Sequence, residues 1–310
     1  MKKIAAIDIG TNTALLLVAE IDARGHLKPV LQKETIVRLG QGVDQRGRLQ
    51  PEAMSRTLQA LREYRLLARE LNAEQILAAG TSAVRDAKNR NDFVSRIKNE
   101  LNLELQILTG KQEARLTHLG ALSNKSYLKG GVVVIDIGGG STEFIFGDRD
   151  QIEFAQSLDL GSVRLTERFV RHDPISEEEF GRIRESVAEG LEKLHRSACS
   201  NKRHLVGVAG TVTTLAAIQA KMANYQPEVI DGDRLSLDQI RAIVDELKIK
   251  TLAERKKIVG LHPKRADVIL AGAVILLESA GGLGFQEVTV SDRGIRFGLI
   301  LDYLTRGGVA

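Results

Sequence analysis

The chain contains one short motif twice, and this repetition constrains its fold more than any other feature. The first copy, residues 7–13, reads IDIGTNT, and the second, residues 135–142, reads IDIGGGST. Each copy ends an apolar, β-branched run, passes through glycine and small hydroxyl residues, and leads into a second apolar run. This pattern predicts a β-hairpin with a glycine-containing tip. Two such hairpins indicate two similar domains packed side by side.

The composition of the two tips suits the binding of phosphate. Glycine lets backbone N–H groups approach an anion closely, and Ser and Thr add hydroxyl donors. Asp8 and Asp136, at the strand ends, can hold a hydrated cation against the same anion. A single copy is equally compatible with a tight hairpin that exposes an aspartate, but the repetition favours two tips that face each other across a cleft. The candidate phosphate-binding residues are Gly10, Thr11, Asn12 and Thr13 in the first copy and Gly138, Gly139, Gly140, Ser141 and Thr142 in the second.

The length of the chain and the order of its elements predict two α/β domains. At 310 residues the chain exceeds the usual size of one hydrophobic core. In the first half we expect strands near 3–9, 14–22, 30–38, 75–79 and 104–107, and helices over 51–71, over 92–101 and from about 111. Strands and helices in this order indicate a sheet with some parallel pairing. A polar segment over 123–131 is interpreted as the linker, which places the domains at 1–124 and 125–310.

The second half is predicted to repeat this plan with a longer helical section. We expect strands at 132–137, 143–146, 152–158, 204–208 and 287–290, and helices over 176–196, 237–247, 265–280 and 294–304. Ser176 and Glu179 predict a capping box at the start of the first of these helices. Cys199 is interpreted as an ordinary small residue at the end of the same helix.

The bulk composition limits the kinds of partner that the chain can have. A net charge of +4 and a hydrophobic content of 43% are ordinary for a globular protein and mildly favour anionic ligands. Without Trp, and with 4% aromatic residues, the chain has no stacking platform for single strands, so nucleic acid is not an expected ligand. One cysteine allows neither an intramolecular disulfide nor a cysteine-based zinc site. No segment approaches the ~20 apolar residues of a membrane span, and no leader precedes the first strand, so we expect a cytoplasmic protein without a membrane partner.

Glu113 is the candidate catalytic residue. It falls in the first turn of a helix that begins near Gly110. A carboxylate at this position gains about 0.3–1 kcal/mol from the helix dipole, which explains many such residues without any catalytic role. The functional alternative is that Glu113 holds and deprotonates the water that attacks phosphorus.

Three further segments have groups suited to phosphate. Gly210 and Thr211 open a helix after a strand, where free N–H groups bind phosphate oxygens, although many such helix starts have no ligand. Arg85 follows small hydroxyl residues and could make a bidentate contact with phosphate; an exposed arginine on a helix is the alternative. Arg265 lies in a basic run over 255–267 that is either a solvated face or a track for a polyanion.

These motifs, in this order, resemble the exopolyphosphatase/guanosine pentaphosphatase (Ppx/GppA) phosphatase family. The strings that carry the resemblance are residues 8–13, 110–114, 136–143, 210–211 and 291–294, and they span nearly the whole chain. The resemblance implies that Glu113 is the catalytic glutamate and that Arg85 lies on the phosphate side of the site. It also implies a divalent cation, Mg²⁺ or another, held by Asp136 and Glu143, and it places Asp8 in the first phosphate loop. Gln112 departs from the family pattern, because many members have an acidic residue before the catalytic one.

The same resemblance implies the fold and the assembly. Members of the family belong to the actin-like ATPase superfamily and have two ribonuclease H-like α/β domains around a central cleft. By analogy, the C-terminal helix at about 294–310 packs back on the first domain, and the second domain has helical insertions. The family also suggests a homodimer.

The expected function is hydrolysis of the terminal phosphoanhydride bond of inorganic polyphosphate. The nearest alternative is the same chemistry on guanosine pentaphosphate, from which the 5′ γ-phosphate would be removed. An ATP-dependent sugar or acetate-type kinase has similar twin loops, but the helix start at Glu113 suits an attacking water better than an alcohol. A non-catalytic alarmone or polyphosphate sensor, or an actin-like scaffold, is the alternative from another class, and the presence of Glu113 argues against it.

Overall fold

The computed structural model describes residues 2–125, 128–194 and 203–307. These residues form two compact units, each built on one β-sheet. Unit 1 comprises Met1–Gly120 and Gly294–Ala310, and unit 2 comprises Ala121–Arg293. In the described ranges, no helix is both long and apolar enough to cross a membrane.

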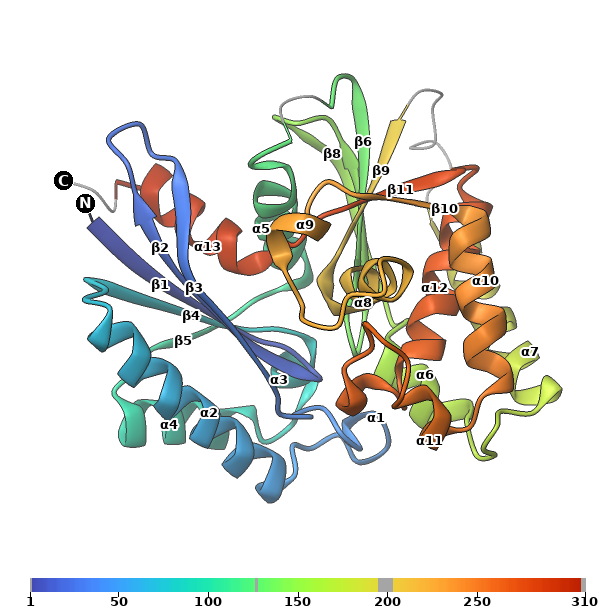
Figure 1. Ribbon diagram of the computed structural model, residues 1–310. Helices are drawn as coiled ribbons and strands as arrows, with labels where there is room; N and C mark the ends of the chain where they lie inside the picture. Colours follow the sequence, from blue (N-terminus) through green and yellow to red (C-terminus); the bar gives the residue numbers. More distant parts are fainter. Residues whose placement is uncertain (1, 126–127, 195–202, 308–310) are drawn as a thin grey trace. The chain divides into compact units, whose positions relative to one another are not determined.

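The sheet of unit 1 has five strands in the order β3-β2-β1-β4-β5 (Figure 1). The strands are β1 (Lys2–Ile9), β2 (Thr13–Ile21), β3 (Leu27–Ile36), β4 (Gln75–Gly80) and β5 (Leu105–Ile107). β2 is antiparallel to both β1 and β3, whereas β1, β4 and β5 are parallel. The helices are α1 (Val43–Arg46), α2 (Pro51–Glu70), α3 (Ser82–Asp86), α4 (Arg90–Leu101), α5 (Gly110–Leu122) and α13 (Ile295–Thr305).

Alternating side chains of β1 contribute to two different cores. Ile7 and Ile9 pack with residues of α2 and α4. Ile4 and Ala6, on the opposite face, pack with residues of α5 and α13. Because successive strand residues point to opposite faces, Asp8 shares the face of Ile4 and Ala6. Unit 1 is therefore a three-layer structure in which Asp8 and α5 belong to the same side of the sheet.

The sheet of unit 2 has six strands in the order β10-β11-β9-β6-β7-β8. The strands are β6 (Gly131–Ile137), β7 (Thr142–Gly147), β8 (Ile152–Leu158), β9 (Arg203–Val208), β10 (Arg234–Ser236) and β11 (Glu287–Val290). The helices are α6 (Ser162–Phe169), α7 (Glu177–Glu192), α8 (Ala209–Gln219), α9 (Pro227–Ile230), α10 (Leu237–Ile249), α11 (Leu252–Arg255) and α12 (Ile269–Gly282). One face of β6 and β7 packs in a large core with α7, α8, α10 and α12.

The two sheets have a common topology. In each unit an antiparallel meander of three strands, β1-β2-β3 or β6-β7-β8, is followed by a strand parallel to the first, β4 or β9. This is the ribonuclease H-like arrangement. The prediction of two similar α/β domains is confirmed at the level of strand order and direction.

Most of the predicted elements are present within a few residues of their expected bounds. The predicted capping box is confirmed: the Ser176 side chain accepts from the N–H of Glu179, and the Glu179 carboxylate accepts from the N–H of Ser176. The helix expected from residue 265 begins instead at Ile269. The reason is that Pro263–Arg265 forms a 3-10 turn capped by the side chain of His262.

A few short elements are not predicted from sequence. α6 has eight residues and β10 has three, too few for a hydrophobic period to stand out. The last residues of the helix expected over 176–196, and Cys199, lie outside the described residues.

Candidate functional site

The two hairpin tips have the same backbone geometry. In the first, the N–H of Gly10 donates to the carbonyl of Thr13 at 2.9 Å; in the second, the N–H of Gly138 donates to the carbonyl of Ser141 at 3.0 Å. A Cβ atom added to either glycine would lie 3.1 Å from that same carbonyl oxygen. The repeated sequence is therefore a repeated structure, and both predicted hairpins are confirmed.

Distant segments of unit 1 hold the first tip. The hydroxyl oxygens of Thr11 and Ser82 lie 2.9 Å apart, and both side chains are buried. The N–H of Arg38 donates to the carbonyl of Asn12 at 2.8 Å, and the N–H of Gly40 donates to the carbonyl of Thr11 at 2.8 Å. A Cβ atom on Gly40 would collide with the Thr11 side chain. The conformation of this tip is therefore set by the body of unit 1.

The start of α6 holds the second tip. A Cβ atom on Gly161 would collide with the backbone of Gly139 and Gly140. The backbone N–H of Arg164 donates to the carbonyl of Gly139 at 3.0 Å, and its Nε donates to the carbonyl of Gly140 at 2.7 Å. No side chain larger than hydrogen fits at Gly161 unless the tip moves.

Asp136 and Glu143 face each other across β6 and β7. They are register partners in this antiparallel pair, and their exposed fractions are 7% and 1%. Directly opposed residues lie on one face of the sheet with their Cβ atoms about 4.5–5.5 Å apart, where like charges repel. In unit 1 the residue opposite Asp8 is Leu15. The second hairpin thus differs from the first in presenting two carboxylates side by side.

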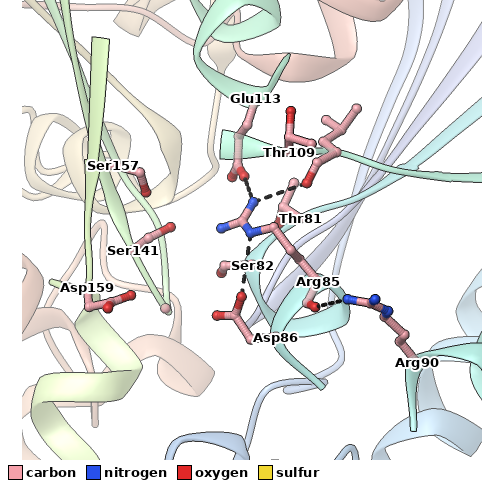
Figure 2. Close-up of polar contacts among 12 residues, drawn as sticks. Thr81, Ser82, Arg85, Asp86, Arg90, Thr109, Glu113, Ser141, Ser157 and Asp159 are labelled. Atoms are coloured by element: carbon pink, nitrogen blue, oxygen red, sulfur yellow. Dashed lines mark hydrogen bonds and ion pairs between the residues drawn. The ribbon is translucent and has the colours of Figure 1, made fainter. Parts of the chain in front are cut away.

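Two serine hydroxyls orient Glu143. The hydroxyls of Ser141, on the tip, and Ser157, on β8, donate to Oε1 of Glu143 at 2.8 and 2.7 Å; both serines are drawn in Figure 2.

The carboxylate pair of Asp136 and Glu143 fits a hard divalent cation, because Mg²⁺ is usually held by one or two carboxylates, water and substrate phosphate. Within residues 2–125, 128–194 and 203–307, no group of three or more His, Cys, Asp or Glu side chains could hold a metal ion. A cation at this pair would therefore take its other ligands from water and phosphate.

Glu113 lies in the first turn of α5 and is 5% exposed. The start of α5 is closed by a reciprocal pair of hydrogen bonds. The N–H of Thr109 donates to Oε1 of Gln112 at 2.9 Å, and the N–H of Gln112 donates to Oγ1 of Thr109 at 3.3 Å. Glu and Gln are interchangeable in such a capping box. Gln112 therefore has a structural role at the position where the resemblance leads one to expect an acidic residue.

Arg85 contacts Glu113 directly (Figure 2). Nη1 of Arg85, at the end of α3, donates to Oε2 of Glu113 at 2.6 Å. Both residues are expected at the site from sequence, but their contact is not. The structure thus joins two of the predicted site residues of unit 1 through a charged hydrogen bond.

The structure also brings Gly210 and Arg265 together at the start of α8. A Cβ atom on Gly210 would collide with the Arg265 guanidinium. Ala209, the first residue of α8, has φ 68°, a left-handed conformation that non-glycine residues rarely adopt. Thr211 is buried and packs against Gly272, whose added Cβ would lie 2.7 Å from Oγ1 of Thr211. These contacts place the positively charged guanidinium of Arg265 beside the N-terminus of α8, an arrangement that suits a phosphate oxygen.

Several residues that shape the two tips are not predicted from sequence. They are Gly40, Ser82, Ser157, Gly161 and Arg164. Ser82 has a partial signal, because it lies in the small hydroxyl segment before Arg85. The others have no local signal, since each contacts a tip, or Glu143 in the case of Ser157, from a distant part of the sequence.

The sequence and the fold are similar to those of known proteins. Residues 17–307 match the family described as the Ppx/GppA phosphatase family. The chain is 38% identical to Exopolyphosphatase 2 of Mycobacterium tuberculosis, over 97% of this chain and 98% of that protein. It is 29% identical to a guanosine-5'-triphosphate,3'-diphosphate pyrophosphatase of Aeromonas salmonicida, over 97% of this chain and 59% of that protein.

A solved structure also has the same fold. The crystal structure of the Ppx/GppA family member from Aquifex aeolicus matches with a TM-score of 0.83 at 35% identity, covering 100% of this chain and 99% of that one. The match confirms the predicted fold class, an α/β protein with two ribonuclease H-like domains.

Proposed function

Since this chain belongs to the Ppx/GppA phosphatase family, we propose that it hydrolyses the terminal phosphoanhydride bond of inorganic polyphosphate and releases orthophosphate. It is a phosphoanhydride hydrolase, like both of the named relatives; the substrate and the roles of individual residues are the proposal. The observation that carries the choice of substrate is the likeness to an exopolyphosphatase at 38% identity over 98% of its length.

Guanosine pentaphosphate is the second candidate substrate. It is favoured by the similarity to the guanosine-5'-triphosphate,3'-diphosphate pyrophosphatase, which is weaker, at 29% identity, and covers 59% of that protein. The bond that is broken is of the same kind in both substrates. Polyphosphate is the first choice because the exopolyphosphatase matches this chain almost from end to end.

The two tips are proposed to hold phosphoryl groups. Glycine lets the backbone of a turn approach an anion closely, and the hydroxyls of Thr and Ser add donors. The residues proposed for this role are Gly10, Thr11, Asn12 and Thr13 in the first tip and Gly138, Gly139, Gly140, Ser141 and Thr142 in the second. Gly210 and Thr211 at the start of α8, with Arg265 beside them, are proposed to hold phosphate as well. The fixed conformation of the two tips supports the proposal, because donors that do not reorganise during the reaction stabilise developing charge most effectively.

A divalent cation is proposed as the cofactor, with Mg²⁺ as the first choice. Asp136 and Glu143 would hold it, and Asp8 at the end of β1 is a further proposed cation ligand. When bound, such a cation neutralises charge on phosphate oxygens. The support for this role is the pair of buried carboxylates that face each other across β6 and β7.

Glu113 is proposed as the residue that orients the attacking water and accepts its proton. The water oxygen forms a bond to the terminal phosphorus, and the bridging P–O bond breaks. The bridging oxygen stays with the shortened chain, and the proton passes to the Glu113 carboxylate and then to solvent. The buried position of Glu113 on the first turn of a capped helix supports this role, since general-base catalysis needs a carboxylate held in one place.

A substrate panel tests the proposed function. Initial rates of orthophosphate release would be measured on polyphosphate, guanosine pentaphosphate and ATP, with Mg²⁺ and with excess chelator. We expect polyphosphate to have the highest kcat/KM and the chelator to abolish release. Release from guanosine pentaphosphate alone would show that this nucleotide, and not polyphosphate, is the substrate. Tight binding of polyphosphate without turnover would indicate a sensor.

The same assay tests Glu113. Glu113→Gln should lower kcat by about 10²–10⁴-fold and leave the affinity for polyphosphate nearly unchanged. The matched control is Glu104→Gln, which alters a carboxylate that is 82% exposed and paired with Lys98. If the Glu113 variant keeps the full wild-type turnover, Glu113 has no role in the mechanism.

A further inference from the structure

Arg85 lies between two carboxylates and a backbone carbonyl. Its Nη1 donates to Oε2 of Glu113 at 2.6 Å and to the carbonyl of Leu108 at 3.2 Å, and its Nε lies 3.5 Å from Oδ1 of Asp86. Figure 2 shows the guanidinium between the two carboxylates. The exposed fractions of the side chains are 23% for Arg85, 7% for Glu113 and 40% for Asp86.

The guanidinium binds two parts of one helix start. Leu108 directly precedes the capped turn of α5, and Glu113 projects from the first turn of that helix. One planar group therefore restrains both the backbone that leads into α5 and the carboxylate that extends from it. The arginine is itself anchored, since Nη1 of Arg90 donates to the Arg85 carbonyl at 2.8 Å.

The charges at this position argue against phosphate as the direct partner of Arg85. A phosphate that bound the guanidinium would have to lie close to the carboxylates of Glu113 and Asp86, with which it shares a negative sign. The short, charged hydrogen bond to the nearly buried Glu113 is also stronger than the contact to the exposed Asp86. The geometry therefore makes Glu113 the principal partner of Arg85.

We propose that Arg85 is a positioning residue, which acts on the reaction through Glu113 and is not a direct ligand of phosphate. This inference rests on the proposed function, because it deepens the role of Glu113. The guanidinium fixes the direction of the carboxylate, so that it is ready to accept a hydrogen bond from water. Arg85 should therefore contribute to kcat and contribute little to the affinity for the phosphate chain.

A double-mutant cycle on kcat tests this dependence. Arg85→Gln should lower kcat for polyphosphate by about 10–100-fold, with KM changed less than about threefold. In a Glu113→Gln background the same substitution should have almost no further effect, because it removes the support of a group that is already absent. Arg85→Lys, which retains the charge without the planar fork, should recover part of kcat.

The pH profile gives a readout that a purely structural role would not change. Without the positive charge of the guanidinium beside it, the Glu113 carboxylate is protonated more easily. The acid limb of the profile of kcat against pH should therefore move to higher pH in Arg85→Gln. The matched control is Arg96→Gln, which removes an exposed arginine that pairs with Glu100 on α4. The control should leave kcat, KM and the pH profile unchanged.

Three outcomes separate the possibilities. Losses in kcat that multiply in the double variant, or an acid limb that does not move, would overturn the positioning role. A rise of tenfold or more in the polyphosphate dissociation constant of Arg85→Gln, measured in the Glu113→Gln background to prevent turnover, would make Arg85 a phosphate ligand. If the wild-type protein releases no phosphate, the proposed function fails, and the binding measurement still decides whether Arg85 holds phosphate.

Discussion

Nζ of Lys125 lies 2.7 Å from Oδ1 of Asp231, in an ion pair between side chains that are 1% and 13% exposed. Asp231 also accepts from the N–H of Asp292 at 3.1 Å and from Nδ2 of Asn124 at 2.5 Å. The chain enters unit 2 after Gly120 and leaves it before Gly294. One aspartate therefore binds the first and the last segments of unit 2 together. Burial lowers the pKa of Lys125, and the charge of Asp231 opposes that effect.

Replacement of Asp231 should destabilise unit 2 strongly. Asp231→Asn keeps the shape of the side chain but leaves the buried Lys125 ammonium without its counter-charge, which costs about 3–5 kcal/mol when one partner of a buried pair is removed. Thermal and urea unfolding would measure the loss. Glu178→Gln, at an exposed ion pair with Arg182, is the control and should change stability by less than about 1 kcal/mol. Equal effects of the two substitutions would contradict this account.

Gly161→Ala should displace the second tip. The added methyl group would meet the backbone of Gly139 and Gly140, and relief of such a clash costs about 1–3 kcal/mol. We expect a lower melting temperature and a rise in KM for polyphosphate. Gly181→Ala is the matched control, because nothing lies within 4 Å of its added Cβ and it is inside α7; it should be neutral or stabilising by up to about 1 kcal/mol.

Ser157→Ala should weaken the activation by Mg²⁺. The substitution removes one of the two hydroxyls that donate to Oε1 of Glu143, so the carboxylate is less well oriented. Loss of a partner that orients a metal ligand costs about 10–100-fold in metal affinity or activity. Titration of activity against Mg²⁺ would measure the shift in half-activation, with the exposed Ser55→Ala as control. An unchanged titration would show that Glu143 does not hold the cation.

Acid should destabilise the loop that precedes α7. Burial would raise the pKa of Glu179, but hydrogen bonds from His172, Ser176 and Arg171 outweigh it and lower the pKa from 4.5 to about 2. Because the folded state then binds fewer protons than the unfolded state, Glu179 stabilises the protein above about pH 4.5. That contribution disappears as the pH falls from about 4.5 towards 2.

Melting temperatures of the wild type and Glu179→Gln, followed from pH 7 to pH 3, would measure this contribution. The difference between the two proteins should shrink as the pH falls through this window. A difference that stays constant with pH would show that Glu179 acts through shape alone.

Neighbouring residues alone specify the local structure of the tips and of the helix starts. An apolar, β-branched run, an aspartate and a glycine turn lie next to one another in the chain, so neighbouring residues alone specify a hairpin. This explains why the Gly10–Thr13 and Gly138–Ser141 hydrogen bonds are the same in both copies. The capping box of Ser176 and Glu179 is predictable for the same reason, because its two partners are three residues apart.

The surroundings of those tips depend on contacts between distant elements of the fold. Ser82 reaches Thr11, and Arg164 reaches Gly140, after separations of 71 and 24 residues. Arg85 finds Glu113 across 28 residues, so each of the two was predicted without its partner. Such contacts depend on how strands pair and how helices pack on the sheet, and no pattern of neighbouring residues encodes the distance between two side chains from different elements.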